Sequence, residues 1–268
     1  MRFFTLICGL TILLLAANCS PRIGEKNRGH TLVWADEFSG SEPVNRDKWD
    51  FDIGGKGWGN DEQQFYTDRA ENARQLSGKL VIEARKEDYK GNAYTSARLV
   101  TRGKQTWGPG HRISVRAKLP SGRGTWPAIW MLGENIGQAG WPLCGEIDIM
   151  EHVGFAPDSV FATVHTEAVN HIIGNARSGS ATAPDLETNF HVYALDWHPD
   201  RLEFRFDGHL IHTYRKPANA TEAAWPFDKP QYLLLNLAVG GTWGGRKGVD
   251  DTIWPQRMEV DYVRVLEF

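Results

Sequence analysis

The sequence predicts an all-β fold, in which two antiparallel sheets pack face to face as a β-sandwich. Three observations favour it: alternating polar and apolar segments recur between turn residues, two hairpin turns are sharply marked, and no longer stretch shows helical periodicity. A sandwich of this size can curve one of its sheets into a concave substrate cleft, which suits an extended ligand.

Seven segments have the alternation of half-buried strands. They are residues 79–86, 111–119, 159–166, 190–198, 201–206, 209–214 and 259–268. A continuous apolar run at 232–241 predicts a strand covered on both faces. Pro199-Asp200, after His198, joins two of the strands, and Asp207-Gly208 has the composition of a two-residue hairpin turn with positive φ.

The N-terminus has the pattern of an export signal over residues 1–18. Arg2 precedes an apolar run that is short for a membrane span, and small residues lead to Cys19. A buried strand or an anchor helix is the alternative. The segment "LLAANC" is similar to a bacterial lipoprotein signal, although Asn18 departs from the usual small residue. Lipidation of Cys19 and ordinary cleavage nearby both remain open.

We therefore expect an exported protein, either extracellular, periplasmic or a lipoprotein of the outer membrane. Residues 19–30 would form a short tether, and residues 31–268 a single domain, because all-β domains of about 200–250 residues are common. Among the cysteines, Cys8 lies in the leader and Cys19 is the lipidation candidate, so Cys144 is expected to form no intrachain disulfide.

The formal net charge is −3, and no basic stripe is visible. This pattern gives no indication of a nucleic-acid partner. Contact with a membrane is expected only through a lipid anchor, and the protein is expected to be a monomer. The 11 tryptophans are unusual for this length. Most are expected in the core, but an indole also suits the flat apolar face of a sugar ring.

The segment "GEIDIMEHVG" (145–154) carries the chemistry. Glu146 and Asp148 alternate with isoleucines, as on a two-sided strand, but Glu151 lies one residue too late to continue that row. A β-bulge, with Met150 as the inserted residue, would return Glu151 to the same face. A solvated acidic strand is the alternative, but three carboxylates on one face repel each other and are tolerated mainly for function.

Two carboxylates on either side of a bond are the minimum apparatus for glycoside hydrolysis. In the retaining reaction one attacks the anomeric carbon, and the other protonates the leaving oxygen and then activates water. Their carboxyl groups stand about 5–5.5 Å apart. Asp148, between Glu146 and Glu151, can hydrogen-bond the nucleophile and raise the pKa of the acid.

The acid segment resembles the signature of glycoside hydrolase family 16 in its bulged form, E-x-D-x-x-E. Six further segments resemble bacterial endo-β-1,3-glucanases (laminarinases) in the same order: "WADEFSG", "GWGNDEQQFYTD", "SARLVTRGK", "GTWPAIWMLG", "LNLAVGG" and "MEVDYVRV". The resemblance runs from about Trp34 to Phe268. It implies a jelly roll and retention of configuration, with Glu146 as nucleophile, Asp148 as assistant and Glu151 as acid/base.

The same resemblance indicates residues that bind substrate. Trp126 and Trp130 would share a face of a strand beside the scissile bond, with a core position as the alternative for either. The full set of substrate-binding candidates is Asn60, Glu62, Arg98, Trp126, Trp130, Trp141, His165, Asn236 and Trp243. Within it, Asn236 either orients the acids or is a satisfied core amide, and Trp243 closes one end of the cleft. His165 matches the family's cleft histidine, but Thr166 replaces the usual glycine after it.

No cofactor is expected for the chemistry. Many members of the family carry a structural Ca²⁺ far from the acids. By resemblance its ligands would be the Asp261 side chain with backbone oxygens near Glu37 and Gly78, although Asp261 could also be an ordinary surface acid.

The expected activity is endo-cleavage of β-1,3-glucosidic bonds in laminarin-like glucans. Cleavage of mixed-linkage β-1,3-1,4-glucan is the first alternative. Galactan hydrolysis of the agarase or carrageenase kind ranks lower, because no basic cluster suits a sulfated chain. A non-catalytic β-glucan-binding module ranks last, because all three acids are present.

Overall fold

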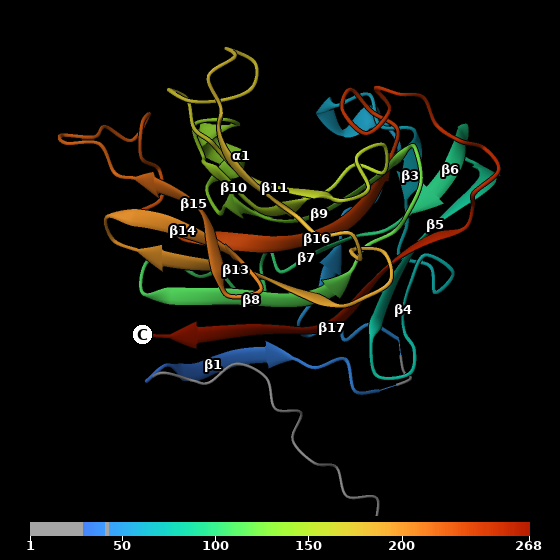
Figure 1. Ribbon diagram of the computed structural model, residues 1–268, viewed down its shortest axis with the longest axis horizontal. Coiled ribbons are helices and arrows are strands. Elements are labelled where there is room, and N and C mark those ends of the chain that lie inside the picture. The colour runs from blue at the N-terminus through green and yellow to red at the C-terminus, as the bar shows by residue number, and fades with distance from the viewer. Residues whose placement is uncertain (1–28, 41–42) are drawn as a thin grey trace, which may run out of the picture.

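The computed structural model describes residues 29–40 and 43–268. The expected export signal and most of the expected tether lie outside these residues. Within them, two sheets pack against each other, the seven-stranded sheet above the ten-stranded sheet in Figure 1. The expected two-sheet, mainly antiparallel sandwich is therefore confirmed. No helix in the described ranges is long and apolar enough to cross a membrane.

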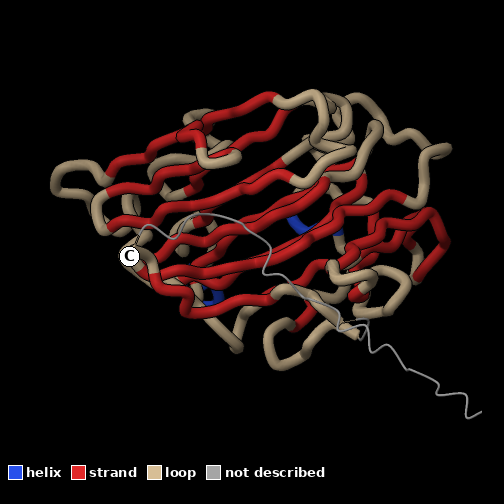
Figure 2. Tube along the Cα trace, turned by 60° about the horizontal axis from the view of Figure 1, so that its bottom comes forward, coloured by secondary structure: helices blue, strands red, loops and turns tan. Residues whose placement is uncertain are grey.

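The ten-stranded sheet has the order β15-β14-β13-β8-β17-β5-β6-β3, with β1 paired to β17 and β4 paired to β5. Its strands are β1 (Thr31–Asp36), β3 (Gln64–Tyr66), β4 (Ala73–Gln75), β5 (Leu80–Tyr89), β6 (Asn92–Ser96), β8 (His111–Lys118), β13 (His191–His198), β14 (Arg201–Phe206), β15 (His209–Arg215) and β17 (Gln256–Glu267). In Figure 2, which brings this sheet toward the reader, the loops gather at the ends of its strands.

The seven-stranded sheet has the order β12-β11-β10-β9-β16-β7-β2. Its strands are β2 (Asp50–Phe51), β7 (Arg98–Val100), β9 (Thr125–Gly133), β10 (Glu146–Glu151), β11 (Ser159–His165), β12 (Arg177–Thr182) and β16 (Gln231–Val239). The only helical pieces of the described chain are η1 (Gly57–Gly59) and α1 (Ile136–Ala139).

Every strand expected from alternation is present, with ends shifted by a few residues. The run at 232–241 becomes β16, which is buried along its whole length, as expected for a strand covered on both faces. Asp207 and Gly208 both have positive φ, 47° and 80°, so the β14–β15 turn has the expected conformation.

The main core lies between the sheets. Ile113 and Val115 of β8 face Ile129 and Met131 of β9 within one cluster of buried apolar residues. A second, smaller cluster lies on the other face of the seven-stranded sheet and contains Val100, Leu132, Cys144, Tyr232 and Leu234. We call this other face, which turns away from the ten-stranded sheet, the site face.

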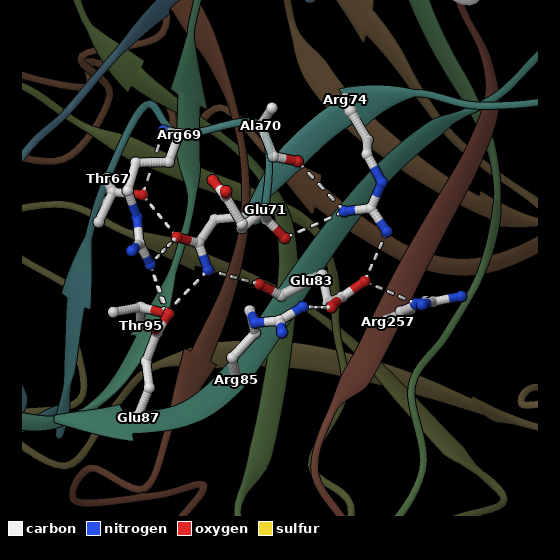
Figure 3. A network of polar contacts seen from close by, with 11 residues as sticks. Thr67, Arg69, Ala70, Glu71, Arg74, Glu83, Arg85, Glu87, Thr95 and Arg257 are labelled. Atoms are coloured by element: carbon white, nitrogen blue, oxygen red, sulfur yellow. Dashed lines mark hydrogen bonds and ion pairs between the residues drawn. The ribbon is translucent and has the colours of Figure 1, made fainter. Parts of the chain in front are cut away.

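A polar network ties β4, β5 and β17 together on the ten-stranded sheet (Figure 3). The buried carboxylate of Glu83 accepts hydrogen bonds from Arg74, Arg85 and Arg257. Desolvation opposes the ionised form of Glu83, but the guanidinium groups of Arg74 and Arg257 hold its pKa below the usual range. The network therefore stabilises the side of the sandwich away from the acids.

Candidate active site

Strand β10 contains a bulge at the expected place. Against β9, Asp148 pairs with Trp130 and Met150 pairs with Ile129, so Ile149 has no partner of its own. Against β11 neither Ile149 nor Met150 has a partner, so the bulge lies at these two residues, as the sequence predicts; against β9 the unpaired residue is Ile149 and not the expected Met150. Ile149 and Met150 are both buried in the main core, since the bulge turns two consecutive side chains to one face.

The bulge brings the three acids to one face. Glu146 lies opposite Leu132, Asp148 opposite Trp130, and Glu151 opposite Ala128. These partners on β9 are an even number of residues apart, and the residues between them, Ile129 and Met131, lie in the core. Glu146, Asp148 and Glu151 therefore all project from the site face.

Glycines frame this strand. Gly145 has φ of 79°, and a Cβ there would lie 2.5 Å from Pro226. A Cβ on Gly154 would lie 1.8 Å from the carbonyl oxygen of Gly122. Any larger residue at either position would have to move the neighbouring backbone or ring, so the glycines fix where the acid strand begins and where the chain leaves it.

Each of the two glutamates receives a hydrogen bond from an indole. Trp141 Nε1 donates to Glu146 Oε2 over 3.0 Å, and Trp126 Nε1 donates to Glu151 Oε1 over 3.1 Å. His165 lies on the neighbouring strand β11, with Nε2 3.3 Å from Asp148 Oδ2 and 3.7 Å from Glu146 Oε1. The predicted residues Trp126, Trp141 and His165 thus lie directly beside the acids.

Burial raises the pKa of Glu146, Asp148 and Glu151, each to about 8. The negative charge of Asp148 adds to the rise for both glutamates, whereas His165 and the two indole donors oppose it. Because the three carboxyls compete for protons, at least one proton remains in the group near neutral pH. The site can therefore offer a carboxylate and a carboxylic acid at the same time.

A hydrogen-bonded chain runs toward β3 from Trp130, the residue opposite Asp148 on β9. Trp130 Nε1 donates to Asn236 Oδ1 over 2.7 Å, and Asn236 Nδ2 donates to the Tyr66 hydroxyl over 3.1 Å. The Tyr66 hydroxyl donates to Glu62 Oε2, and Asn60 Nδ2 donates to Glu62 Oε1. The side-chain hydrogen bonds of Asn236 among the described residues thus go to Trp130 and Tyr66, so of its two expected roles the structure supports the satisfied buried amide.

Arg98 is held between two tryptophans. Its guanidinium carbon lies 5.0 Å from the ring centre of Trp58 and 4.7 Å from that of Trp130, and its Nε lies 3.1 Å from Asp52 Oδ2. The guanidinium also opposes the rise in pKa that burial imposes on Glu62. Arg98 therefore belongs to the site face and is not a solvated strand residue.

Aromatic rings continue along the site face on both sides of the acids. Trp243 makes edge contacts with Trp126 at 5.7 Å and with Phe161 at 5.2 Å between ring centres. At the other end, Trp141 lies against His165. Six of the 11 tryptophans pack in or against the main core, as expected for most of them: Trp34, Trp49, Trp107, Trp197, Trp225 and Trp254.

The structure adds residues that the sequence analysis missed. Trp58 lies between glycines in the loop that carries Asn60, within the segment "GWGNDEQQFYTD", whose resemblance to laminarinases was the available signal. Tyr66 alternates as a buried strand residue and gave no sign of its link to Glu62. His171 lies in a loop that pattern analysis leaves without an assignment, and it contacts Trp141 and His165.

The predicted calcium ligands come from neighbouring segments. Asp261 lies at an irregularity of β17, Glu37 follows β1, and Gly78 precedes β5, and both of these strands pair with β17. However, Asp261 Oδ2 accepts a hydrogen bond from Arg116 over 2.6 Å. This ion pair already balances the negative charge of the Asp261 carboxylate. Asp261 Oδ2 is therefore a poor ligand for Ca²⁺.

Among the described residues, two other groups of side chains converge closely enough to hold a metal ion. Glu146, Asp148 and His165 form one, and Asp196, His198 and Glu203 form the other. In the second group, Asp196 accepts hydrogen bonds from Arg112 and Arg205, so the carboxylate is already neutralised by ion pairs. Cys144, the described cysteine, is free and buried in the smaller apolar cluster.

Residues 59–264 match the family described as glycosyl hydrolases family 16. A β-glucanase of Rhodothermus marinus is 54% identical over 263 residues, which cover 96% of this chain and 92% of the relative. A glucan endo-1,3-β-glucosidase of Cryptopygus antarcticus is 38% identical over 95% of this chain and 97% of its own length.

The similar solved structures are also glucanases. The laminarinase from Rhodothermus marinus superposes with a TM-score of 0.86 at 52% identity, covering 89% of this chain and 97% of that chain. A non-specific endo-β-1,3(4)-glucanase of the same family superposes with a TM-score of 0.85 at 45% identity, covering 90% of this chain and 92% of that chain.

Proposed function

The chain belongs to glycosyl hydrolase family 16, and on that premise we propose that it is an endo-acting β-1,3-glucanase that cleaves laminarin-like glucans with retention of configuration. One observation carries the proposal: Glu146 and Glu151 lie on the same face of β10, each with an indole donor, on either side of Asp148. The retaining reaction needs two carboxyl groups that flank the scissile bond, and a shared face of one strand lets both reach the same bond.

In the first step Glu146 attacks the anomeric carbon, and the bond from that carbon to the bridging oxygen breaks. Glu151 gives its proton to the bridging oxygen, which leaves as the hydroxyl group of the departing sugar chain. Trp141 and His165 favour the ionised form of Glu146, because an indole N–H and a nearby imidazole both stabilise a carboxylate. Burial favours the protonated form of both glutamates, and in this step the proton is on Glu151.

In the second step Glu151, now a carboxylate, takes a proton from water while the water oxygen attacks the anomeric carbon. The ester bond to Glu146 breaks, and the carboxylate is restored. Trp126 stabilises the carboxylate of Glu151 during the interval when it is ionised. Asp148 assists from its position between the two glutamates: whenever its carboxyl is ionised, the negative charge favours the protonated form of Glu151.

The substrate chain would lie along the site face. Trp126, Trp130, Trp141 and Trp243 offer flat apolar surfaces that match the faces of glucose rings. Asn60, Glu62, Arg98 and His165 offer polar groups for sugar hydroxyls. The buried Asn236 acts indirectly, because its hydrogen bonds hold Trp130 and Tyr66 in place.

Mixed-linkage β-1,3-1,4-glucan is a second candidate substrate. The favouring observation is the similarity to a non-specific endo-β-1,3(4)-glucanase over 90% of this chain. The chemistry at Glu146 and Glu151 is the same for either linkage.

We also propose that the protein is exported and that it acts as a monomer. The apolar leader that ends at Cys19 supports export, either as a lipoprotein or as a protein cleaved nearby. Mass spectrometry of the mature N-terminus separates the two: an acylated Cys19 indicates the lipoprotein, and a free α-amino group excludes it. Light scattering of the purified chain tests the monomer, and a dimer mass would refute it.

Product analysis of the purified protein tests the function. Laminarin, barley mixed-linkage glucan, agarose and carrageenan are incubated separately, and new reducing ends are counted. We expect oligosaccharides of several lengths from laminarin at early times, because an endo-acting enzyme cuts at internal bonds. A chain that releases no reducing ends from any β-glucan is not a β-glucanase.

A further inference from the structure

The loop at residues 166–175, which follows β11, is held in one conformation by a single buried side chain. Asn170 is 4% exposed. Its Nδ2 donates to the carbonyl oxygens of Thr166 and Glu167, and its Oδ1 accepts from the backbone N–H groups of Ile172 and Ile173. We call residues 166–175 the Asn170 loop. So many internal hydrogen bonds mean that the loop is formed before any ligand arrives.

Asn175 reinforces the same arrangement. Its Oδ1 accepts from the Asn170 backbone N–H over 3.0 Å, and its Nδ2 donates to the Ala168 carbonyl oxygen over 3.1 Å. In Figure 1 the yellow segment after β11 rises above the seven-stranded sheet, on the side away from the ten-stranded sheet. The Asn170 loop therefore stands on the site face.

His171 links this loop to the acids. Its ring centre lies 5.3 Å from that of Trp141 and 5.1 Å from that of His165. Those two residues are the ones that contact Glu146. Burial and the neighbouring His165 lower the pKa of His171, so near neutral pH its imidazole is uncharged, with one N–H donor and one acceptor nitrogen.

The loop tip is apolar and exposed. Ile172 is 72% exposed and Ile173 is 57% exposed, and they are the two most exposed large apolar side chains of the described residues. Adjacent exposed isoleucines give the loop tip an apolar surface that a ligand could cover. Their backbone N–H groups are bound by Asn170, so they cannot turn inward without breaking those hydrogen bonds.

We propose that the Asn170 loop is a preformed wall of the glucan-binding site. In it, His171 contacts a hydroxyl group of a sugar near Glu146, and Ile172 and Ile173 contact the apolar faces of sugars farther along the chain. The inference rests on the proposed β-glucanase function. A glucan chain fits this surface because each pyranose ring has polar edges and apolar faces, which match an uncharged imidazole beside two isoleucines.

Binding to a series of laminarin oligosaccharides, from the disaccharide upward, tests the proposal. Calorimetry in a Glu146→Gln background measures affinity without cleavage. We expect His171→Ala to weaken binding about five- to tenfold. His171→Phe keeps the ring contacts with Trp141 and His165 but has no hydrogen-bonding nitrogen, so it should weaken binding to a similar extent. His209→Ala, at an exposed histidine of β15, is the matched control and should bind as the parent does.

The tip is tested with Ile172→Ser combined with Ile173→Ser. We expect this double variant to lose about three- to tenfold in affinity for the longer oligosaccharides and nothing for the disaccharide. Leu210→Ser on β15, 51% exposed, is the matched control. Melting temperatures of all variants verify that the folded state persists.

The outcomes separate this inference from the proposed function. Tight binding without any cleavage by the unmutated enzyme would overturn only the proposed activity. Parent-like affinity in His171→Ala, or in His171→Phe, would overturn the contact between His171 and a sugar hydroxyl. Equal losses on short and long oligosaccharides in the double isoleucine variant would overturn the contact of the loop tip with sugar faces. A Glu146→Gln chain that binds no β-glucan would overturn both.

Discussion

Trp141 donates its indole N–H to Glu146 over 3.0 Å, and Trp126 makes the equivalent hydrogen bond to Glu151 over 3.1 Å. The two bonds stabilise the ionised form of different carboxyls. In the proposed reaction Glu146 must be ionised and Glu151 must be protonated. The two tryptophans therefore control opposite sides of the pH dependence.

Trp141→Phe should move the acidic limb of the kcat/KM profile to higher pH by about one unit. Loss of the N–H donor raises the pKa of Glu146, so a higher pH is needed to ionise it. Trp126→Phe should move the alkaline limb to higher pH instead, since Glu151 then keeps its proton longer. Full pH profiles on laminarin measure both limbs. A shift of the same limb in both variants would contradict the separate roles.

Glu146→Gly and Glu151→Ala should each lose at least about 10³-fold in kcat. Azide should restore turnover in Glu146→Gly and yield an α-glycosyl azide, because a small anion then attacks in place of the missing carboxylate. In Glu151→Ala, azide should yield the β-glycosyl azide by attacking the glycosyl-enzyme. NMR of the products assigns the anomers, and exchanged anomers would reverse the two roles.

Asp148→Asn should stabilise the protein more at high pH than at low pH. The pKa of Asp148 is raised to about 8 by burial, so the folded chain holds a proton that the unfolded chain has lost above about pH 4. The stability that this bound proton gives is fully present below the pKa of Asp148 in the unfolded chain. It is lost as the pH rises through the pKa of Asp148 in the folded chain. Asparagine carries no such proton.

Calorimetry at pH 5 and pH 9 measures the effect. We expect the difference in Tm between Asp148→Asn and the parent to increase by a few degrees at the higher pH, with a large loss of activity at both. An unchanged difference in Tm would mean that Asp148 is not protonated in the folded state.

Deletion of Ile149 tests the bulge. Without this residue, Glu146, Asp148 and the former Glu151 alternate regularly and remain on the site face. We expect measurable cleavage, well above that of Glu151→Ala, despite a loss of about 2–5 kcal/mol from the missing core side chain. Insertion of an alanine between Ile149 and Met150 also gives an even spacing, but in a regular strand it places Glu151 opposite Trp126 and not Ala128, about 6.6 Å farther from Asp148, so we expect cleavage to be lost. Activity in a folded insertion variant, or none in a folded deletion variant, would contradict the account of the bulge.

The sequence by itself determined the strands with clear alternation, the continuous apolar strand and the identity of the acids. Alternation with period two and turn residues such as Asp207-Gly208 are local properties, set by side-chain geometry and backbone sterics, and β13, β14 and β15 follow from them within a residue or two. The extra residue between Asp148 and Glu151 was also visible, since a break in parity requires either a bulge or a reversed side chain.

Only the tertiary structure decided which residue is extra and which groups meet. Ile149 rather than Met150 lacks a partner because the register of β10 is fixed by its pairing with β9. Asn236 bonds to Trp130 and Tyr66, Arg98 lies between Trp58 and Trp130, and His171 reaches Trp141. Each of these contacts joins segments far apart in the chain. No local pattern encodes them, because they depend on how the strands and loops pack in three dimensions.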